Sequence, residues 1–167
     1  ETLECWEIAL KSENTPSAIA LSRQKVPYIN PKNSKDNNCE KGAYTVSLTS
    51  HESNVILVAS GTEVELALKV QDKLKENNIH SKVVSMPCME LFDKQSEGYR
   101  KDILEENSLI ITIEAGSIMS WQKYVKNKGL NLGIDKFGES APYKEVYKHF
   151  KLSEEDITNY IQKKLRE

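Results

Sequence analysis

The residues best placed for chemistry in this sequence are an arginine and a carboxylate that each follow an apolar run. Arg23 comes just after the apolar run at 17–21, and Glu114 comes directly after the run at 109–113. Open α/β sheets bind ligands beyond the carboxyl ends of their strands, where a guanidinium can hold a phosphate with two hydrogen bonds. Position alone still favours an ordinary surface arginine at the junction of a strand and a linker.

Glu114 and Glu139 are a second candidate pair, because two carboxylates that converge can act as an acid and a base. Glu139 lies in a predicted loop at 137–142, far along the chain from Glu114. Their spacing does not bring them together. Hydrogen bonding within a loop or an interface is therefore the favoured interpretation of both.

The run Ser60-Gly61-Thr62 brings backbone N–H groups to the start of a predicted helix, where an anion can bind. The run lacks both the G-x-G-x-x-G pattern and the Walker lysine. Glu63 and Glu65 fall in the first helical turn, where their charges repel anions. We favour a capped turn, in which Thr62 and Glu65 form a T-x-x-E capping box.

The histidines and the aromatic residues give no further site. His51, His80 and His149 lack the spacing of metal ligands and are interpreted as structural or solvated. Trp121 and Tyr124 are predicted to pack on the sheet rather than to hold a cofactor. The main body of the chain therefore predicts no catalytic, cofactor-binding or metal-binding residue of its own.

Composition excludes several classes of partner. The 167 residues carry 23 basic and 25 acidic side chains, so no global field favours nucleic acid or an anionic membrane. No apolar run approaches the roughly 20 residues that a membrane span needs. The three cysteines have no C-x-x-C spacing, which favours a reducing compartment and predicts a cytoplasmic protein; they are Cys5, Cys39 and Cys88.

The elements that position these residues follow an α/β plan. An apolar run without alternation, at 55–59, predicts a strand buried on both faces, and an apolar stripe at helical spacing follows it at 66–74. Alternation at 43–48 predicts an edge strand with one wet face. Five strands are predicted in this body, at residues 43–48, 55–59, 82–86, 109–113 and 130–134.

The amino-terminal residues do not fit that body. The run at 17–21 predicts a fully buried strand, and the next forty residues offer no equally apolar neighbour for it. Residues 1–26 are therefore predicted to be the tail of an upstream domain, 27–41 a polar linker and 42–167 the main domain. The start Glu1-Thr2-Leu3, without methionine, is expected to be an internal one.

Several segments, in order along nearly the whole chain, resemble the carboxyl-terminal part of transketolase. Each matches a short pattern of that family, and their joint order makes the resemblance specific. They are L-S-R-Q at 21–24, A-S-G-T-E-V-E-L-A at 59–67, V-V-S-M-P at 83–87 with F-D-K-Q at 92–95, E-A-G at 114–116 and F-G-E-S-A-P at 137–142.

The resemblance implies a three-layer α/β/α domain with a five-stranded mixed sheet whose first strand is antiparallel. It also implies a homodimeric parent enzyme that uses thiamine diphosphate and a divalent metal, Mg²⁺ or Ca²⁺, to move a two-carbon ketol unit between sugar phosphates. In that family the arginine of L-S-R-Q contacts the terminal phosphate of the sugar, so Arg23 becomes the expected substrate-binding residue. The cofactor motifs of the family lie upstream, and this chain alone is expected to be inactive and free of cofactor.

Two other interpretations stay open. One is a non-catalytic module for dimer assembly or regulation. The other is the terminal domain of a different thiamine-dependent enzyme, such as a deoxyxylulose phosphate synthase or a ketoacid dehydrogenase β chain. The S-R-Q run at 22–24 together with F-G-E-S-A-P at 137–142 favours transketolase.

Overall fold

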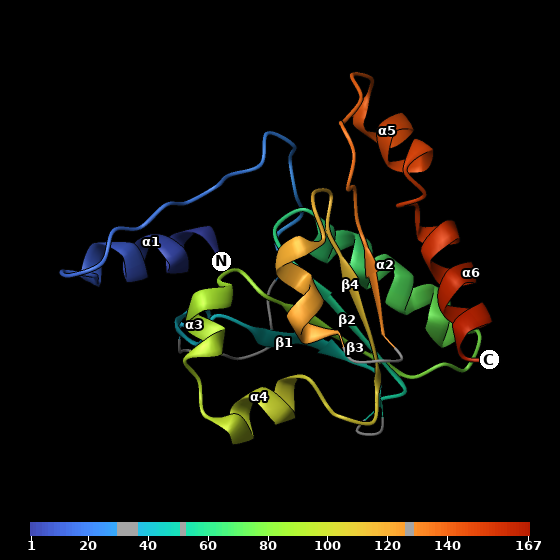
Figure 1. Cartoon of the computed structure of the whole chain (residues 1–167), viewed down its shortest axis with the longest axis horizontal. Coiled ribbons are helices and arrows are strands. Elements are labelled where there is room, and N and C mark those ends of the chain that lie inside the picture. Colours follow the sequence, from blue (N-terminus) through green and yellow to red (C-terminus); the bar gives the residue numbers. More distant parts are fainter. Residues whose placement is uncertain (30–36, 51–52, 126–128) are drawn as a thin grey trace.

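The computed structural model describes residues 1–29, 37–50, 53–125 and 129–167. Figure 1 shows an open, twisted sheet with helices on both sides. The strands run in the order β1-β3-β2-β4-β5, with β1 antiparallel to β3 and every other pair parallel. They are β1 (Tyr44–Leu48), β2 (Val55–Ala59), β3 (Ser81–Ser85), β4 (Leu109–Ile113) and β5 (Leu130–Leu132). The predicted five-stranded mixed sheet is confirmed.

Strand β2 is the centre of the sheet. All five of its residues are buried, as its unalternated apolar run predicts. It pairs in parallel with β3 on one side, where Val58 lies opposite Val84, and with β4 on the other, where Val58 lies opposite Thr112. Alternate side chains of β2 therefore supply the cores on the two faces of the sheet.

Helices cover both faces and make the three layers. The first face carries the apolar stripe of α2, together with Ile157 and Ile161 of α6. The second face carries Phe92, Ile103 and Trp121, which come from α3, α4 and the 3₁₀ helix η2. The helices are α1 (Thr2–Lys11), α2 (Glu63–Glu76), α3 (Met89–Asp93), α4 (Glu97–Ile103), α5 (Tyr143–His149) and α6 (Glu154–Lys164), with 3₁₀ turns η1 (Asn38–Lys41) and η2 (Met119–Tyr124).

The expected capping box at the start of α2 is wrong. Thr62 has helical backbone angles, with φ −63° and ψ −30°, and its side chain makes no capping bond. Its hydroxyl instead lies 2.6 Å from the Glu63 carboxylate, while Glu65 pairs with Lys69. A capping side chain reaches the helical N–H groups from an extended backbone. Ser153, which is extended, does cap α6 in this way.

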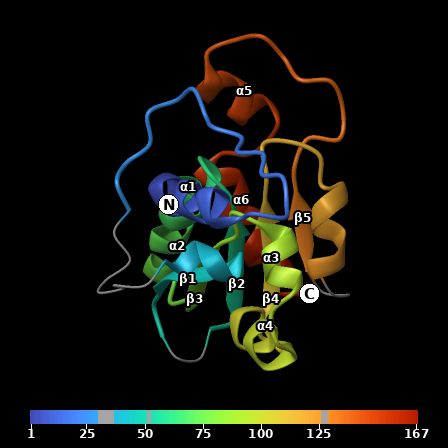
Figure 2. The same cartoon turned by 90° about the vertical axis from the view of Figure 1, so that its left-hand side faces the viewer.

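The expected buried strand at 17–21 is also wrong. This segment forms no strand, and Leu21 leaves 61% of its surface exposed. Figures 1 and 2 show it within an extended chain that runs back from α1 along the outside of the domain. The described part of the chain gives it no strand to pair with, since the five strands pair among themselves. Its apolar residues therefore stay at the surface.

Gly42 lies just before β1, and its geometry admits no side chain. Its φ is +77°, and a Cβ there would lie 2.2 Å from the Phe92 nitrogen and 2.3 Å from the Cys88 oxygen. The Gly42 oxygen accepts a hydrogen bond from the Cys88 nitrogen at 3.1 Å. The edge strand and α3 therefore meet by direct contact of their backbones.

We expect Gly42→Ala to lower the free energy of unfolding by about 2–5 kcal/mol, because it adds left-handed strain to a steric clash. Urea unfolding followed by circular dichroism measures the effect. Gly98→Ala is the matched control, because a Cβ at Gly98 meets nothing within 4 Å and the position is helical. The control should leave stability unchanged or raise it by up to about 1 kcal/mol. Equal effects of the two substitutions would contradict the close approach.

Candidate functional site

Two of the predicted candidate segments meet at the carboxyl edge of the sheet. Ser60 follows β2 and Glu114 follows β4, and these two strands are parallel neighbours. The chain goes from β2 to β3 on one side, whereas β4 pairs on the other, so the strand order reverses direction here. Open sheets bind ligands at such a point. The carboxyl ends of β2 and β4, which we call the crevice, are therefore where this rule places a ligand.

Glu114 is half-buried in this crevice and accepts two hydrogen bonds. The indole nitrogen of Trp121 donates to it at 3.1 Å and the Ser60 hydroxyl at 3.5 Å. Burial raises the pKa of Glu114, the charge of Glu63 raises it further, and the two hydrogen bonds oppose the rise. The glutamate thus holds η2 to the end of β2.

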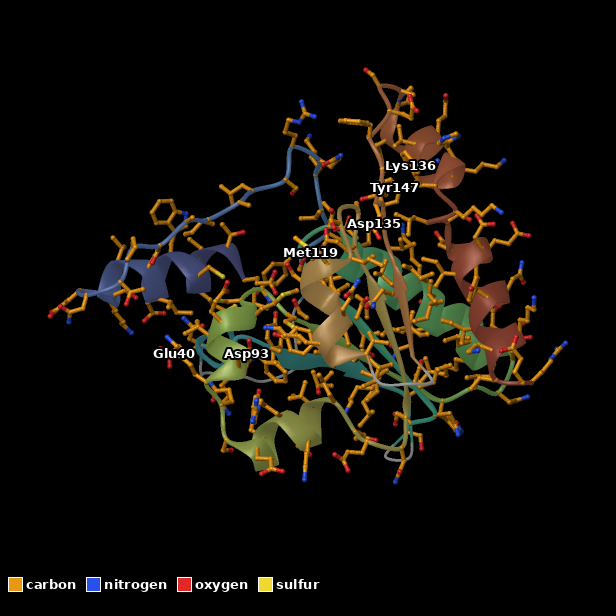
Figure 3. The ribbon with its side chains drawn as sticks, in the orientation of Figure 1. Glu40, Asp93, Met119, Asp135, Lys136 and Tyr147 are labelled. Atoms are coloured by element: carbon orange, nitrogen blue, oxygen red, sulfur yellow. The ribbon has the colours of Figure 1, made fainter. Side chains whose placement is uncertain are left out.

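Glu63 is the second carboxylate of the crevice, and only 5% of it is exposed. It accepts hydrogen bonds from the Thr62 hydroxyl and from the Tyr147 phenol of α5. Tyr147 lies between α5 and the body of the domain (Figure 3), and burial raises its pKa. With both partners in place, Glu63 is an acceptor that ties α5 to α2.

The other candidates lie outside this group. Glu139 is exposed in its loop, and the carboxylate whose charge acts on Glu114 is Glu63. Two acidic side chains at the Ser60 turn make it a poor anion site, in line with the interpretation as a simple turn. The crevice thus holds two hydrogen-bonded carboxylates, and the hydroxyls of Ser60 and Thr62 serve as donors to them.

The structure tests the predictions for the aromatic residues and for two of the three histidines. Trp121 and Tyr124 are buried in the core on the second face, as predicted. His149 rests edge-on against Phe150, His80 is exposed, and His51 lies outside the described residues. Across the described ranges, no three His, Cys, Asp or Glu side chains are arranged to hold a metal ion.

Arg23 lies in the extended chain after α1, so it does not follow a strand here. The residue is exposed, and the described part of the chain supplies neither an ion-pair nor a hydrogen-bond partner for it. The residues directly after it, 24–26, approach α2 and α5. Its guanidinium is therefore open to an external anion.

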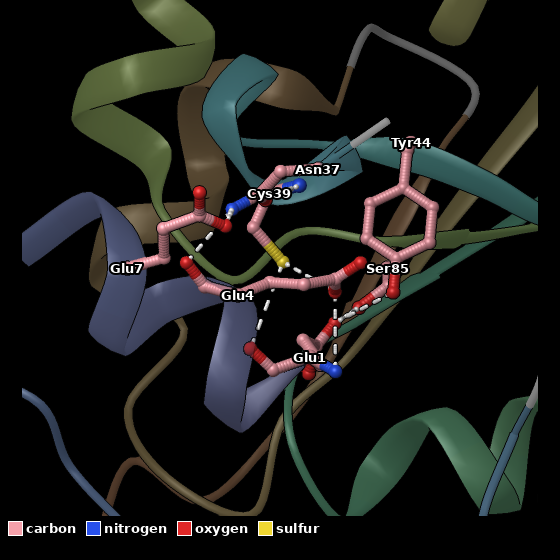
Figure 4. A network of polar contacts seen from close by, with 7 residues as sticks. All are labelled: Glu1, Glu4, Glu7, Asn37, Cys39, Tyr44 and Ser85. Carbon is pink, nitrogen blue, oxygen red and sulfur yellow. Dashed lines mark hydrogen bonds and ion pairs between the residues drawn. The ribbon is translucent and has the colours of Figure 1, made fainter. Parts of the chain in front are cut away.

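A polar network that the sequence interpretation missed holds α1 to the domain (Figure 4). The Asn37 amide donates to the Glu4 carbonyl at 2.9 Å, and the Cys39 thiol faces the Glu4 carboxylate at 3.4 Å. Tyr44 and Ser85 both donate to a Glu1 carboxylate oxygen. The network comprises Glu1, Glu4, Glu7, Asn37, Cys39, Tyr44 and Ser85.

The consequence is that α1 faces the domain with its acidic side. Its apolar residues point away, and Leu3, Trp6 and Leu10 are 84%, 49% and 79% exposed. The sequence did hold a signal for this arrangement, because glutamates at 1, 4 and 7 recur at helical spacing on one face. Among the described helices, none is long and apolar enough to cross a membrane.

The fold and its crevice define an α/β/α domain of the open-sheet class, with both faces of a mixed sheet covered by helices. The family model of the transketolase-like TK C-terminal domain matches residues 42–153. The chain belongs to that family.

Relatives match almost the whole chain. It is 41% identical to transketolase from Rhodobacter capsulatus and 39% identical to the chloroplastic transketolase of Solanum tuberosum, in each case over 94% of this chain. The solved transketolase of Campylobacter jejuni is 35% identical over 97% of this chain, with a TM-score of 0.86. The chain covers only 24%, 21% and 24% of these three proteins, so it spans about a quarter of their length.

We expect Glu114→Gln to stabilise the domain at neutral pH and not at acidic pH. Because the folded pKa of Glu114 lies above the ordinary 4.5, the folded state holds more protons than the unfolded state in the window above 4.5. Wild-type stability therefore falls as pH rises through that window, and the amide removes this loss. Urea unfolding at pH 4 and pH 7 measures it, with Glu139→Gln as the exposed control. A variant no more stable than wild type at pH 7 would contradict the assignment.

Proposed function

We propose that this chain is the carboxyl-terminal part of a transketolase, which transfers a two-carbon ketol unit from a ketose phosphate to an aldose phosphate. The main support is sequence identity. Over almost its whole length the chain is about 40% identical to transketolases that are about four times as long. A related transketolase from Pichia stipitis, 32% identical with a TM-score of 0.89, was solved in complex with sedoheptulose-7-phosphate. Sugar phosphates are therefore the substrate class that we propose for the parent enzyme.

We further propose that residues 1–26 are the tail of an upstream domain, 27–41 a linker and 42–167 the terminal domain. The outward apolar stripe of α1 supports this division, as does the exposed run at 17–21. A helix in a finished globular protein turns such a stripe toward a core. An upstream sheet would supply the core that both segments lack.

Arg23 is the substrate-binding residue that we propose for the parent enzyme. Its exposure and its lack of a partner in the described chain support that role. A guanidinium offers two parallel N–H donors, which match two oxygens of a phosphate and fix its orientation. Arg23 would hold the terminal phosphate of the sugar as a binding group and would transfer no proton.

Thiamine diphosphate, a divalent metal and a homodimer belong to the proposal for the full-length enzyme. The described residues do not fit that cofactor, because they form no cluster that could hold the metal beside a diphosphate. We therefore derive no step through it. Three free thiols, at Cys5, Cys39 and Cys88, support a reducing compartment such as the cytoplasm, although several relatives are chloroplastic.

A second candidate function for the isolated chain is a non-catalytic module for assembly or regulation. The crevice between β2 and β4 favours it, because its two carboxylates are already occupied by hydrogen bonds from Ser60, Thr62, Trp121 and Tyr147. A terminal domain of this kind would serve the parent enzyme by packing rather than by chemistry.

We expect the isolated chain to bind thiamine diphosphate with a Kd weaker than about 1 mM, because the residues that the structure describes provide no metal cluster. Calorimetric titration with cofactor and Mg²⁺ measures the affinity, and a full-length transketolase is the positive control. Binding at low micromolar concentration would refute the assignment of cofactor binding to upstream sequence.

In the full-length enzyme, we expect Arg23→Ala to raise KM for phosphorylated donors by about 10–100-fold, the worth of one bidentate charged contact. The kcat should change less, because the contact lies away from the reacting carbons. Arg166→Ala, which removes an exposed arginine near the end of the chain, is the control. An equal loss with unphosphorylated ketoses would argue against a phosphate contact.

A further inference from the structure

A pocket of about 490 Å³ opens on the side of the domain away from α3 and α4. Its walls come from α2, from α5, from the start of α6 and from residues 24–26. Neither Arg23 nor Glu114 lines it, although Thr62 and Tyr147, the two donors to Glu63, do. Its volume lies within the range of pockets that bind small organic molecules.

Five lysines and three glutamates line this pocket, so lysines outnumber glutamates at its rim. The lining includes the glutamates Glu65, Glu154 and Glu155, of which the first is paired with Lys69 at 2.7 Å and the second lies 3.9 Å from Lys73. The lining lysines without an ion-pair partner in the described chain are Lys25, Lys144 and Lys148. Three ammonium groups facing a single hollow favour an anion with more than one negative charge.

Two of these lysines are positioned together by α5. Lys144 and Lys148 are four residues apart and so lie on one face of the helix. The helix itself is tied to α2 by the bond from Tyr147 to the buried Glu63. Lys25 lines the same pocket from the extended chain. An anion bound between the three lysines would join two segments that are far apart in the sequence, residues 24–26 and α5.

The remaining lining of the pocket is apolar or aromatic. Leu66 and the buried Leu152 contribute aliphatic surface. Tyr143 and Tyr147 stand with their rings at 89° and their centroids 6.1 Å apart. Surfaces of this kind bind the flat or apolar part of a small molecule while the charged rim holds its polar end.

We propose that this pocket binds a small phosphomonoester with a planar or apolar organic part. The dianionic phosphate lies among Lys25, Lys144 and Lys148, and the organic part lies against Leu66 and the two tyrosines. The site belongs to the terminal domain and does not depend on the phosphate contact proposed for Arg23.

Phenyl phosphate is the probe, titrated into the ¹⁵N-labelled chain and followed by amide chemical shifts. We expect shifts confined to α5, the first half of α2 and residues 152–155, with binding at least about fivefold tighter than that of inorganic phosphate because the ring adds apolar contact. The double variant Lys144→Gln with Lys148→Gln should weaken binding by at least about tenfold. Lys94→Gln with Lys101→Gln removes the same charge from the α3–α4 side and should leave binding unchanged.

Three results would overturn the proposal. Shifts spread over lysines on every face, or equal weakening by the two double variants, would mean nonspecific attraction of an anion. Equal affinity for phenyl phosphate and inorganic phosphate would mean that the apolar lining takes no part. Absence of binding at 10 mM phenyl phosphate would exclude the site itself. A Kd of roughly 10 mM is the weakest that would be useful for a metabolite site.

Discussion

Burial of β2 on both faces is the constraint on which the rest of this structure depends. A strand with five buried residues needs a neighbour on each side and a layer of helices above and below. Parallel neighbours require crossovers, and the helices α2, α3 and α4 lie on those crossovers. The position of the crevice follows from how these crossovers return to the sheet.

The same constraint explains why the crevice at the carboxyl edge is occupied by its own side chains. Strands that end side by side bring the residues after them together, and here these include Ser60 and Glu114. Burial makes an unpartnered carboxylate costly, so each carboxylate is met by donors from a different element. Trp121 comes from η2 and Tyr147 from α5. In many open sheets this edge binds a ligand. Here its carboxylates bind side chains of the two helices η2 and α5 instead.

The sheet could be predicted from the sequence because its signals are local. Apolar runs without alternation, an alternating edge strand and regular helical stripes each lie within a few residues of one another. The cap of α6 is local in the same way, since it depends on Ser153 and the turn that follows. The cap of α2 was mispredicted because the backbone of Thr62 is helical and its hydroxyl lies against Glu63, while Glu65 pairs with Lys69.

The features that could not be predicted are contacts between residues that are far apart in the chain. The pocket combines residues 24–26 with α2, α5 and α6, and no periodicity relates these segments. The contact of Asn37 and Cys39 with Glu4 likewise spans more than thirty residues. The strand expected at 17–21 was mispredicted for a related reason, because an apolar run forms a strand only where another strand completes its hydrogen bonds.

The orientation of α1 connects these observations. A helix that offers glutamates to a domain must have those charges met, and Asn37, Tyr44 and Ser85 meet them with amide and hydroxyl donors. Once the acidic side is fastened in this way, the stripe of Leu3, Trp6 and Leu10 can only face outward. Covering exposed apolar side chains is favourable and lowers the free energy by about 25 cal/mol for each Å² of apolar surface buried. The apolar side of α1 is therefore open to a further contact, and most of the run at 17–21 is exposed as well.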